Sequence, residues 1–388
     1  MKEKIAQMVD SMEEQLIDLA KKIFDLAELS YEEKESSSLL ANFLEENDFS
    51  VRRNVAGLNT AFLAETGKGR PKIALLAEYD ALPEIGHACG HNMIGVMSCG
   101  AAVALKKALQ DLQFTLLVVG CPAEEKGAGK KELIKAGVFE DVDVAMMIHP
   151  ASMSTGFDIS YAIRRYKVEF FGRSAHAAAD PVSGKNALDA MILLFNAIGL
   201  WRQQLPEKVR IHGIITNGGQ SFNTIPEYTS AEIGIRALRV EQLEGLEERF
   251  FTLVRAAGDM ADCRSNVVRQ EQMLEVYVNV PLAKKLEENY RLVGEEVVPR
   301  TYEQGVGSTD MGEVSHVVPS IHAYINITNG KPIPTHTREF AKAANSPEGY
   351  QAMLRATKAL AFTVYDLATD EKLLQEVKQY FQERRREF

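Results

Sequence analysis

The sequence predicts an α/β protein with two domains. The larger has a mainly parallel sheet with helices on both faces, and the smaller, ferredoxin-like domain is inserted into it. Short apolar runs at Ile73–Ala77, Phe114–Val119 and Val144–Ile148 have the length of buried strands. A helical pattern at about 93–109 separates the first two runs, and apolar strands alternating with helices are typical of a parallel sheet. The middle of the chain shows the order β-α-β-β-α-β, which is the ferredoxin-like pattern.

The larger domain also contains elements near both ends of the chain. Residues 1–28 carry apolar side chains at helical spacing, which predicts one amphipathic helix. The other expected elements are a helix at 35–46, a strand at 321–327, an amphipathic helix at 346–366 and a polar helical tail from Glu371.

The inserted domain is expected to have six elements. In chain order they are a strand at 166–171, a helix at 186–200, strands at 210–216 and 229–238, a helix at 241–257 and a strand-like stretch at 267–280. The expected domain boundaries therefore divide the chain into 1–162, 163–277 and 278–388, with the first and last parts forming one domain.

Charge and cysteine content exclude several classes of protein. A net charge of −10, with no basic block outside Arg384–Arg386, argues against a nucleic-acid partner. Four cysteines in 388 residues are too few for a disulfide framework. The charged N-terminus lacks the apolar core of a signal peptide, and no apolar run approaches the roughly 20 residues of a membrane span. We therefore expect a soluble, cytoplasmic protein with reduced thiols and no membrane partner.

Side chains suited to chemistry follow each of the three apolar strands. The first strand leads into Glu78-Tyr79-Asp80 and then into His87–Asn92; the second leads into Glu124-Glu125 and the third into His149. In open α/β sheets, ligands bind beyond the carboxyl ends of the strands. We therefore expect these three segments to meet in one crevice.

A thiol, imidazoles and carboxylates together are typical of a transition-metal site. Two adjacent glutamates repel each other unless a cation neutralises them, and one can bind a metal while the other activates water. Taken singly, Glu124-Glu125 also fits a solvated loop, Cys89 a small core residue, and His149 a core histidine bonded to the backbone. Their occurrence after three separate strands favours the metal site.

Later segments add further candidates. His336 lies in a proline-rich loop and is a plausible distal ligand, although a surface histidine fits the same pattern. His176 follows the first strand of the inserted domain, and Asn223 places a polar amide in that domain.

An ordered set of motifs resembles the two-metal aminoacylase and carboxypeptidase family of metallopeptidases. The resemblance lies with the amidohydrolase branch, which includes aminobenzoyl-glutamate hydrolase subunits and N-acyl-amino-acid hydrolases. The motifs, in order, are EYDALPEIGHACGHN, PAEEKGAGK, MIHP, GRSAHAAADP, SFNTIPE, GSTDMG and THTREF. They extend over nearly the whole chain, and their joint order is specific although no single motif is.

The resemblance implies a catalytic domain that binds two divalent metal ions, expected to be zinc or manganese, with cobalt or nickel as alternatives. Residues 163–277 would form a lid that makes a homodimer, which could pair further into a tetramer. The implied metal ligands are Cys89, His91, Glu125, His149 and His336. The other implied roles are Glu124 as general base, Asp80 as the residue orienting a ligand, His176 as oxyanion stabiliser, and Asn223, His176 and Asp310 in substrate binding.

Two positions depart from the family pattern. Glu78 stands where the classical peptidases have a histidine, and Asn92 stands where many amidohydrolases have an aspartate. Either change could alter one metal position. Five other residues are not carried over as ligands: His87, Cys121, His212, His316 and His322.

The expected function is metal-dependent hydrolysis of amide bonds in small N-acyl or N-aminoacyl amino acids and dipeptides. One alternative is a cysteine hydrolase with Cys89 as nucleophile, although the sequence offers no evident triad. The other alternative is a non-catalytic protein that binds small amides on the same scaffold.

Overall fold

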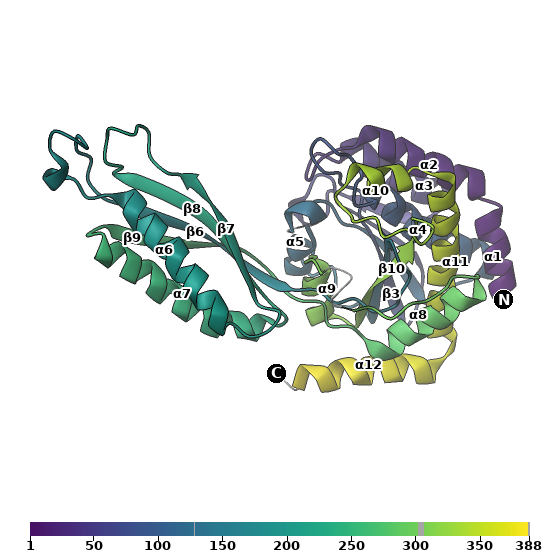
Figure 1. Cartoon of the computed structure of the whole chain (residues 1–388). Coiled ribbons are helices and arrows are strands. Elements are labelled where there is room, and N and C mark those ends of the chain that lie inside the picture. Colours follow the sequence, from purple (N-terminus) through teal and green to yellow (C-terminus); the bar gives the residue numbers. More distant parts are fainter. Residues whose placement is uncertain (128, 302–305, 387–388) are drawn as a thin grey trace. The chain divides into compact units, whose positions relative to one another are not determined.

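The computed structural model describes residues 1–127, 129–301 and 306–386, and its contacts divide the chain into two compact units (Figure 1). The first unit comprises Met1–Ile159, Val276–Gly305 and Thr309–Phe388, and the second comprises Ser160–Glu275 and Val306–Ser308. The assignment of catalysis to one part and of lid and dimer formation to the other stays a prediction.

The first unit contains a six-stranded sheet in the order β1-β2-β4-β3-β5-β10. β3 is parallel to β4 and β5, and β5 is parallel to β10, which confirms the predicted, mainly parallel sheet. β1 and β2 form an antiparallel edge that the sequence analysis missed, because β1 is short, polar and largely exposed. The bounds are β1 Ser50–Arg53, β2 Phe62–Gly67, β3 Lys72–Ala77, β4 Thr115–Gly120, β5 Val144–Ala151 and β10 Ser320–Asn326.

The register of this sheet aligns the carboxyl ends of β3, β4 and β5. The last residues of β3 and β4, Ala77 and Gly120, are paired. Leu75 pairs with Met146, and these residues lie three positions before Glu78 and His149. The segments that follow β3, β4 and β5 therefore begin next to one another.

Helices pack on both faces of this sheet (Figure 1). The connections from β3 through α4 to β4 and from β4 through α5 to β5 run in opposite directions, and right-handed crossovers then place α4 and α5 on opposite faces. The helices are α1 Lys2–Asp10, α2 Glu13–Leu26, α3 Lys34–Glu46, α4 His91–Leu109, α5 Gly129–Lys135, α8 Val280–Leu292, α9 Met311–Val317, α10 Arg338–Ala343, α11 Pro347–Thr369 and α12 Glu371–Arg386.

The single helix expected at 1–28 is wrong, because the structure breaks it into α1 and α2 at Ser11 and Met12. The Ser11 hydroxyl donates a hydrogen bond to the Met8 carbonyl at 2.8 Å. Such local bonds offer the backbone an alternative to helical continuation.

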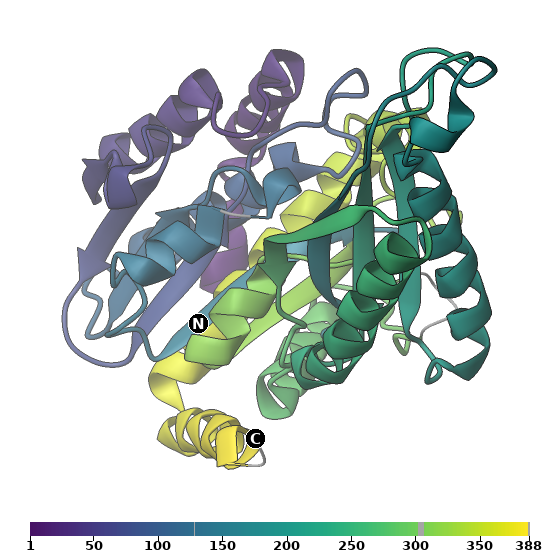
Figure 2. The same ribbon diagram turned by 90° about the vertical axis from the view of Figure 1, so that its left-hand side faces the viewer.

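The second unit has the predicted order βαββαβ, with the antiparallel sheet β7-β8-β6-β9. Its helices α6 and α7 lie side by side on one face of the sheet (Figures 1 and 2). The strand expected at 267–280 is too long, since β9 ends at Met273, which pairs with Ile163 near the start of β6. The bounds are β6 Ala162–Phe171, α6 Ala187–Trp201, β7 Arg210–Asn217, β8 Tyr228–Ala237, α7 Val240–Met260 and β9 Arg264–Met273.

Among the described residues, none of the helices combines the length and apolar character that a bilayer span requires. All four cysteines are buried and free.

Candidate metal centre

Asp80 and His91 form a buried pair in the site. Asp80 follows β3 and His91 begins α4, and the two side chains are fully buried. The Asp80 Oδ1 atom lies 3.0 Å from His91 Nδ1, while its Oδ2 accepts hydrogen bonds from Ser30 and from the Glu125 backbone. Burial alone would raise the pKa of Asp80, but the His91 hydrogen bond and charge lower it to about 2. The carboxylate is therefore ionised, and its bond to Nδ1 orients the His91 ring so that Nε2 faces into the site.

Cys89 and His149 form a second buried contact in the site. The Cys89 Sγ atom lies 3.4 Å from His149 Nε2, and His149 Nδ1 donates a hydrogen bond to the Pro150 carbonyl at 2.7 Å. Burial lowers the pKa of His149 to about 3 and raises the pKa of Cys89 to about 12. His149 is therefore neutral with Nε2 available, and Cys89 needs a cation beside it to become a thiolate.

Gly90 allows the segment that holds Cys89 and His91 to lie close to Pro150 at the end of β5. Its φ of +81° is a left-handed conformation, and a Cβ atom added there would lie 2.8 Å from two atoms of the Pro150 ring. Only glycine fits both requirements, so the Cys-Gly-His order places Cys89 and His91 close to the end of β5.

A tight turn after β4 presents the two glutamates. Ala123 has a φ of 59°, strained for a residue with a Cβ atom, and a short 3₁₀ turn covers Glu124–Lys126. The Ala123 amide donates to Glu33 Oε1 at 2.8 Å, which fixes the turn from a second element. Burial, followed by repulsion from Glu78 and Asp310, raises the pKa of Glu124 well above its ordinary value.

The proline-rich loop that contains His336 lies next to Glu125. The His336 amide donates to the Ala88 carbonyl at 2.8 Å, and His336 Nε2 lies 3.6 Å from Glu125 Oε2. The His336 side chain is 52 % exposed, unlike the others. The other oxygen of Glu125, Oε1, faces His91 Nε2 at 3.9 Å.

The donor atoms of these residues fit divalent metal ions. Tetrahedral zinc, with bonds of about 2.0–2.3 Å, separates neighbouring donors by about 3.3–3.7 Å. The pairs Cys89–His149 and Glu125–His336 lie at 3.4 and 3.6 Å. Glu125 Oε1 and His91 Nε2 are also buried without a hydrogen-bond partner in the described chain, although buried polar atoms are normally paired. Candidate groups with all donor atoms within 4.8 Å of one another are Cys89, His91 and His149; Cys89, Glu125 and His336; His91, Glu124 and Glu125; and Glu78, Glu124 and Asp310.

Asp310 has surroundings that the sequence did not suggest. It was expected in a substrate-pocket loop, but the structure buries it completely at the start of α9. Both of its oxygens accept hydrogen bonds from Lys130, one from the ammonium and one from the backbone amide. The place of Asp310 in a substrate pocket stays a prediction.

The two departures from the family pattern have different consequences. The Asn92 amide donates to the carbonyls of Ala344 and Ala20, so it ties α4 to neighbouring helices. Glu78, in contrast, lies inside the site, with Oε1 bonded to Lys130 at 2.6 Å and Oε2 located 3.6 Å from His91 Nε2.

His176 and Asn223 belong to the second unit, where adjacent loops hold them. The Ala177 amide donates to the Asn223 carbonyl at 2.9 Å, and the side chains of His176 and Asn223 are exposed. His176 Nδ1 accepts hydrogen bonds from the amides of Ala178 and Ala179. Its proton therefore resides on Nε2, which is left as a hydrogen-bond donor.

Sequence reasoning missed the buried partners of the site, namely Lys130, Glu33 and Ser30. Lys130 closes the PAEEKGAGK motif, but lysine is almost never fully buried, so its position carried no signal. Ser30 and Lys130 each pair with a carboxylate that is 50 or more positions away in the sequence. Such long-range pairs leave no local sequence pattern.

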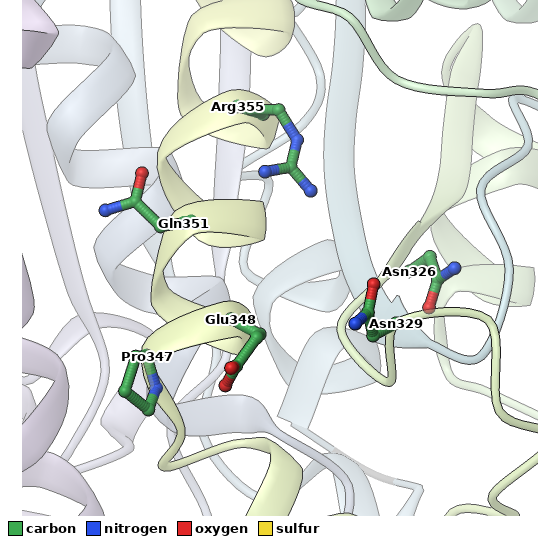
Figure 3. Close-up of a pocket in the computed structure, with 6 residues that line it drawn as sticks. All are labelled: Asn326, Asn329, Pro347, Glu348, Gln351 and Arg355. Atoms are coloured by element: carbon green, nitrogen blue, oxygen red, sulfur yellow. The ribbon is translucent and has the colours of Figure 1, made fainter.

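A separate hollow of about 320 Å³ lies between the end of β10 and the start of α11 (Figure 3). It contains none of the residues predicted for the site. Its lining residues are Asn326, Asn329, Pro347, Glu348, Gln351 and Arg355.

The chain is similar to known hydrolases along most of its length. Residues 74–359 match the model of Peptidase family M20/M25/M40, which is well over half of the chain. The chain is 36 % identical to a mouse Xaa-Arg dipeptidase, over 98 % of this chain and 92 % of that protein. It is 29 % identical to a p-aminobenzoyl-glutamate hydrolase component of Escherichia coli, over 98 % of this chain and 94 % of that protein.

A solved structure from Bacillus subtilis has the same fold. It is described as a dinuclear metal binding peptidase of the M20 family and superposes with a TM-score of 0.68. The match covers 89 % of this chain and 98 % of the other at 20 % identity.

Proposed function

The chain belongs to Peptidase family M20/M25/M40, and on that premise we propose that it is a metal-dependent hydrolase of amide bonds in small N-acyl or N-aminoacyl amino acids and dipeptides. The observation that carries the proposal is the convergence of buried donor atoms after three parallel strands, with Glu124 beside them. Relatives that hydrolyse a dipeptide, an aminobenzoyl-glutamate and N-acetyl-L-cysteine, by their names, support the substrate class.

We assign the metal ligands as Cys89, His91, Glu125, His149 and His336, for two divalent ions, with zinc or manganese tested first and cobalt or nickel next. Thiolate, imidazole and carboxylate donors suit these ions and disfavour magnesium or calcium, which bind oxygen ligands. For Asp80 we propose a positioning role through His91. Asp310, which accepts a hydrogen bond from Lys130, is proposed to belong to the substrate pocket.

When bound, divalent ions at this site would polarise the scissile carbonyl and make water a better nucleophile. Glu124 would accept the proton of the attacking water and then deliver it to the leaving amine. Burial favours the protonated form that the second step needs, and the positive charge of bound ions would lower the pKa of Glu124 so that it can accept a proton in the first step. His176 would donate its Nε2 hydrogen to the developing oxyanion, and Asn223 would contact the substrate.

The two alternatives make different demands on the same residues. A cysteine hydrolase needs Cys89 as a thiolate without metal, and burial opposes this by raising the pKa of Cys89 to about 12. A non-catalytic binding protein has no need for Glu124 beside the metal ligands. We also propose a cytoplasmic homodimer formed through residues 163–277.

Substrate assays on purified protein test the proposal. The panel would contain dipeptides with C-terminal arginine or lysine, aminobenzoyl-glutamate and N-acetyl amino acids, with zinc, manganese or cobalt added to metal-free protein. Hydrolysis that depends on the added metal supports the proposal. Hydrolysis that survives a strong chelator but is lost to a thiol alkylator would establish the cysteine mechanism instead.

A further inference from the structure

The two oxygens of Glu78 have different surroundings. Oε1 accepts a hydrogen bond from the Lys130 ammonium at 2.6 Å, whereas Oε2 has neither solvent contact nor a hydrogen-bond partner in the described chain. The side chains of both residues are 0 % exposed. A buried carboxylate oxygen without a partner is costly, so one is expected to face a missing cation or donor.

Lys130 holds Glu78 in a single orientation. Its ammonium binds Asp310 as well as Glu78, and its own backbone amide donates to Asp310 Oδ2 at 3.1 Å. Two carboxylates therefore share one buried cation, which leaves Glu78 with an oxygen to spare. Rotation of Glu78 would break its bond to Lys130. Breaking a buried ion pair is strongly unfavourable, so the arrangement holds Glu78 in place.

The spare oxygen faces the unpartnered nitrogen of His91. Glu78 Oε2 lies 3.6 Å from His91 Nε2, which is too long for a hydrogen bond. His91 Nδ1 is bonded to Asp80, so the Nε2 edge of the ring is turned toward Glu78 Oε2, where a divalent ion would take the place of a proton between the two atoms. A separation of 3.6 Å is within the about 3.3–3.7 Å expected for two donors on one tetrahedral ion.

We propose that Glu78 binds, through Oε2, the same divalent ion that His91 binds through Nε2, and that Lys130 is the positioning residue that directs Glu78 toward this ion. This inference rests on the proposed function and adds a sixth protein ligand to its metal centre. It also gives Glu78 a role in place of the histidine that classical relatives have at this position.

Metal titration of the Glu78→Gln variant tests the inference. Glutamine keeps the shape and can still accept from Lys130, but it is a poor ligand for these ions. We expect wild-type metal-free protein to bind two Co²⁺ ions, and Glu78→Gln to bind one of them about 10- to 100-fold more weakly with a changed visible spectrum. The matched control is Glu295→Gln, a buried glutamate of the same unit bonded to Ser154 and Arg355, which should leave both affinities unchanged.

Lys130→Met tests the positioning role without removing a donor atom. It should weaken the same Co²⁺ site, and the double variant with Glu78→Gln should lose no more than the single variants, because both act through one oxygen. Additive losses in the double variant would overturn the role of Lys130.

Two binding constants in Glu78→Gln equal to those of the wild type would overturn the inference while leaving the proposed function intact. A wild-type protein that binds no divalent ion would instead defeat the proposed function. If circular dichroism shows that a variant is unfolded, crystals of metal-loaded wild-type protein decide. An anomalous peak within about 2.2 Å of Glu78 Oε2 supports the inference, and one beyond about 3 Å contradicts it.

Discussion

Each of the two compact units has a cluster of charged side chains around a buried carboxylate, and the two clusters differ in how their carboxylates are satisfied. In the second unit, Glu247 Oε1 accepts from Tyr166 at 3.0 Å and from Arg269 at 2.8 Å. Its Oε2 accepts from Arg164 at 3.4 Å and again from Arg269. Donors of the chain thus complete this cluster, which is what a structural ion pair requires.

In the first unit the cluster is left incomplete by the chain itself. Single atoms of Glu78, His91 and Glu125 are buried without a hydrogen-bond partner among the described residues, and the His91 atom lies 3.6 Å from that of Glu78 and 3.9 Å from that of Glu125. A protein tolerates such atoms when something else completes them. The difference between the clusters indicates which buried charges support the fold and which await a ligand.

Among variants that distinguish the two clusters, Glu124→Gln is expected to have the largest effect on kcat. If Glu124 moves protons and does not hold the metal, kcat should fall by about 10²- to 10⁴-fold while metal content stays at the wild-type level. Steady-state kinetics and elemental analysis of the same sample measure both quantities. Loss of metal together with activity would show that Glu124 is a ligand.

Glu247→Ala should have the opposite profile. Removing it leaves the buried Arg164 without its carboxylate, whereas the half-exposed Arg269 can turn to solvent, so the free energy of unfolding should fall by about 1–3 kcal/mol. Urea denaturation with and without metal should give the same loss. A loss that depends on metal would mean that the clusters are coupled.

His176→Ala asks whether the second unit contributes to the reaction as well as to the fold. Loss of one oxyanion donor costs about 10²- to 10³-fold in kcat. Metal binding and thermal stability should be unaffected, because the His176 side chain is exposed. Near-normal turnover would remove the oxyanion role.

Glu275, in the second unit, provides a smaller, pH-dependent effect. Burial raises its pKa to about 7 from an ordinary value of 4.5. The folded state then binds more protons than the unfolded state between these two pH values, so its stabilising contribution is lost as the pH rises from about 4.5 to 7. A tenfold difference in proton affinity between the two states corresponds to about 1.4 kcal/mol of unfolding free energy. Glu275→Gln should flatten the dependence of unfolding free energy on pH in this window, and an unchanged slope would contradict the assignment.

The sequence supported prediction of those parts of the fold that follow from local pattern. The apolar runs that became β3, β4 and β5, and the βαββαβ order of the second unit, are periodic signals. The break between α1 and α2 and the edge strand β1 were missed, since a single serine and four mostly polar residues hardly alter the pattern.

The sequence indicated the candidate metal ligands but not the residues that surround them. Strand-end positions indicated Glu124-Glu125 and His149, because parallel strands end at one edge. The burial of Lys130 depends on its bonds to Asp310, which lies 180 positions away, and no local pattern contains such a contact. The same holds for the spare oxygen of Glu78, which becomes visible only when every hydrogen bond around it is known.

Metal counting is the most direct test of the claim that the incomplete cluster is a metal centre. Protein purified without chelator, then stripped and reloaded, would be analysed for bound metal and for amide hydrolysis in the same samples. We expect two divalent ions per chain, with hydrolysis lost on stripping and restored on reloading. Full hydrolysis by metal-free protein would contradict the account.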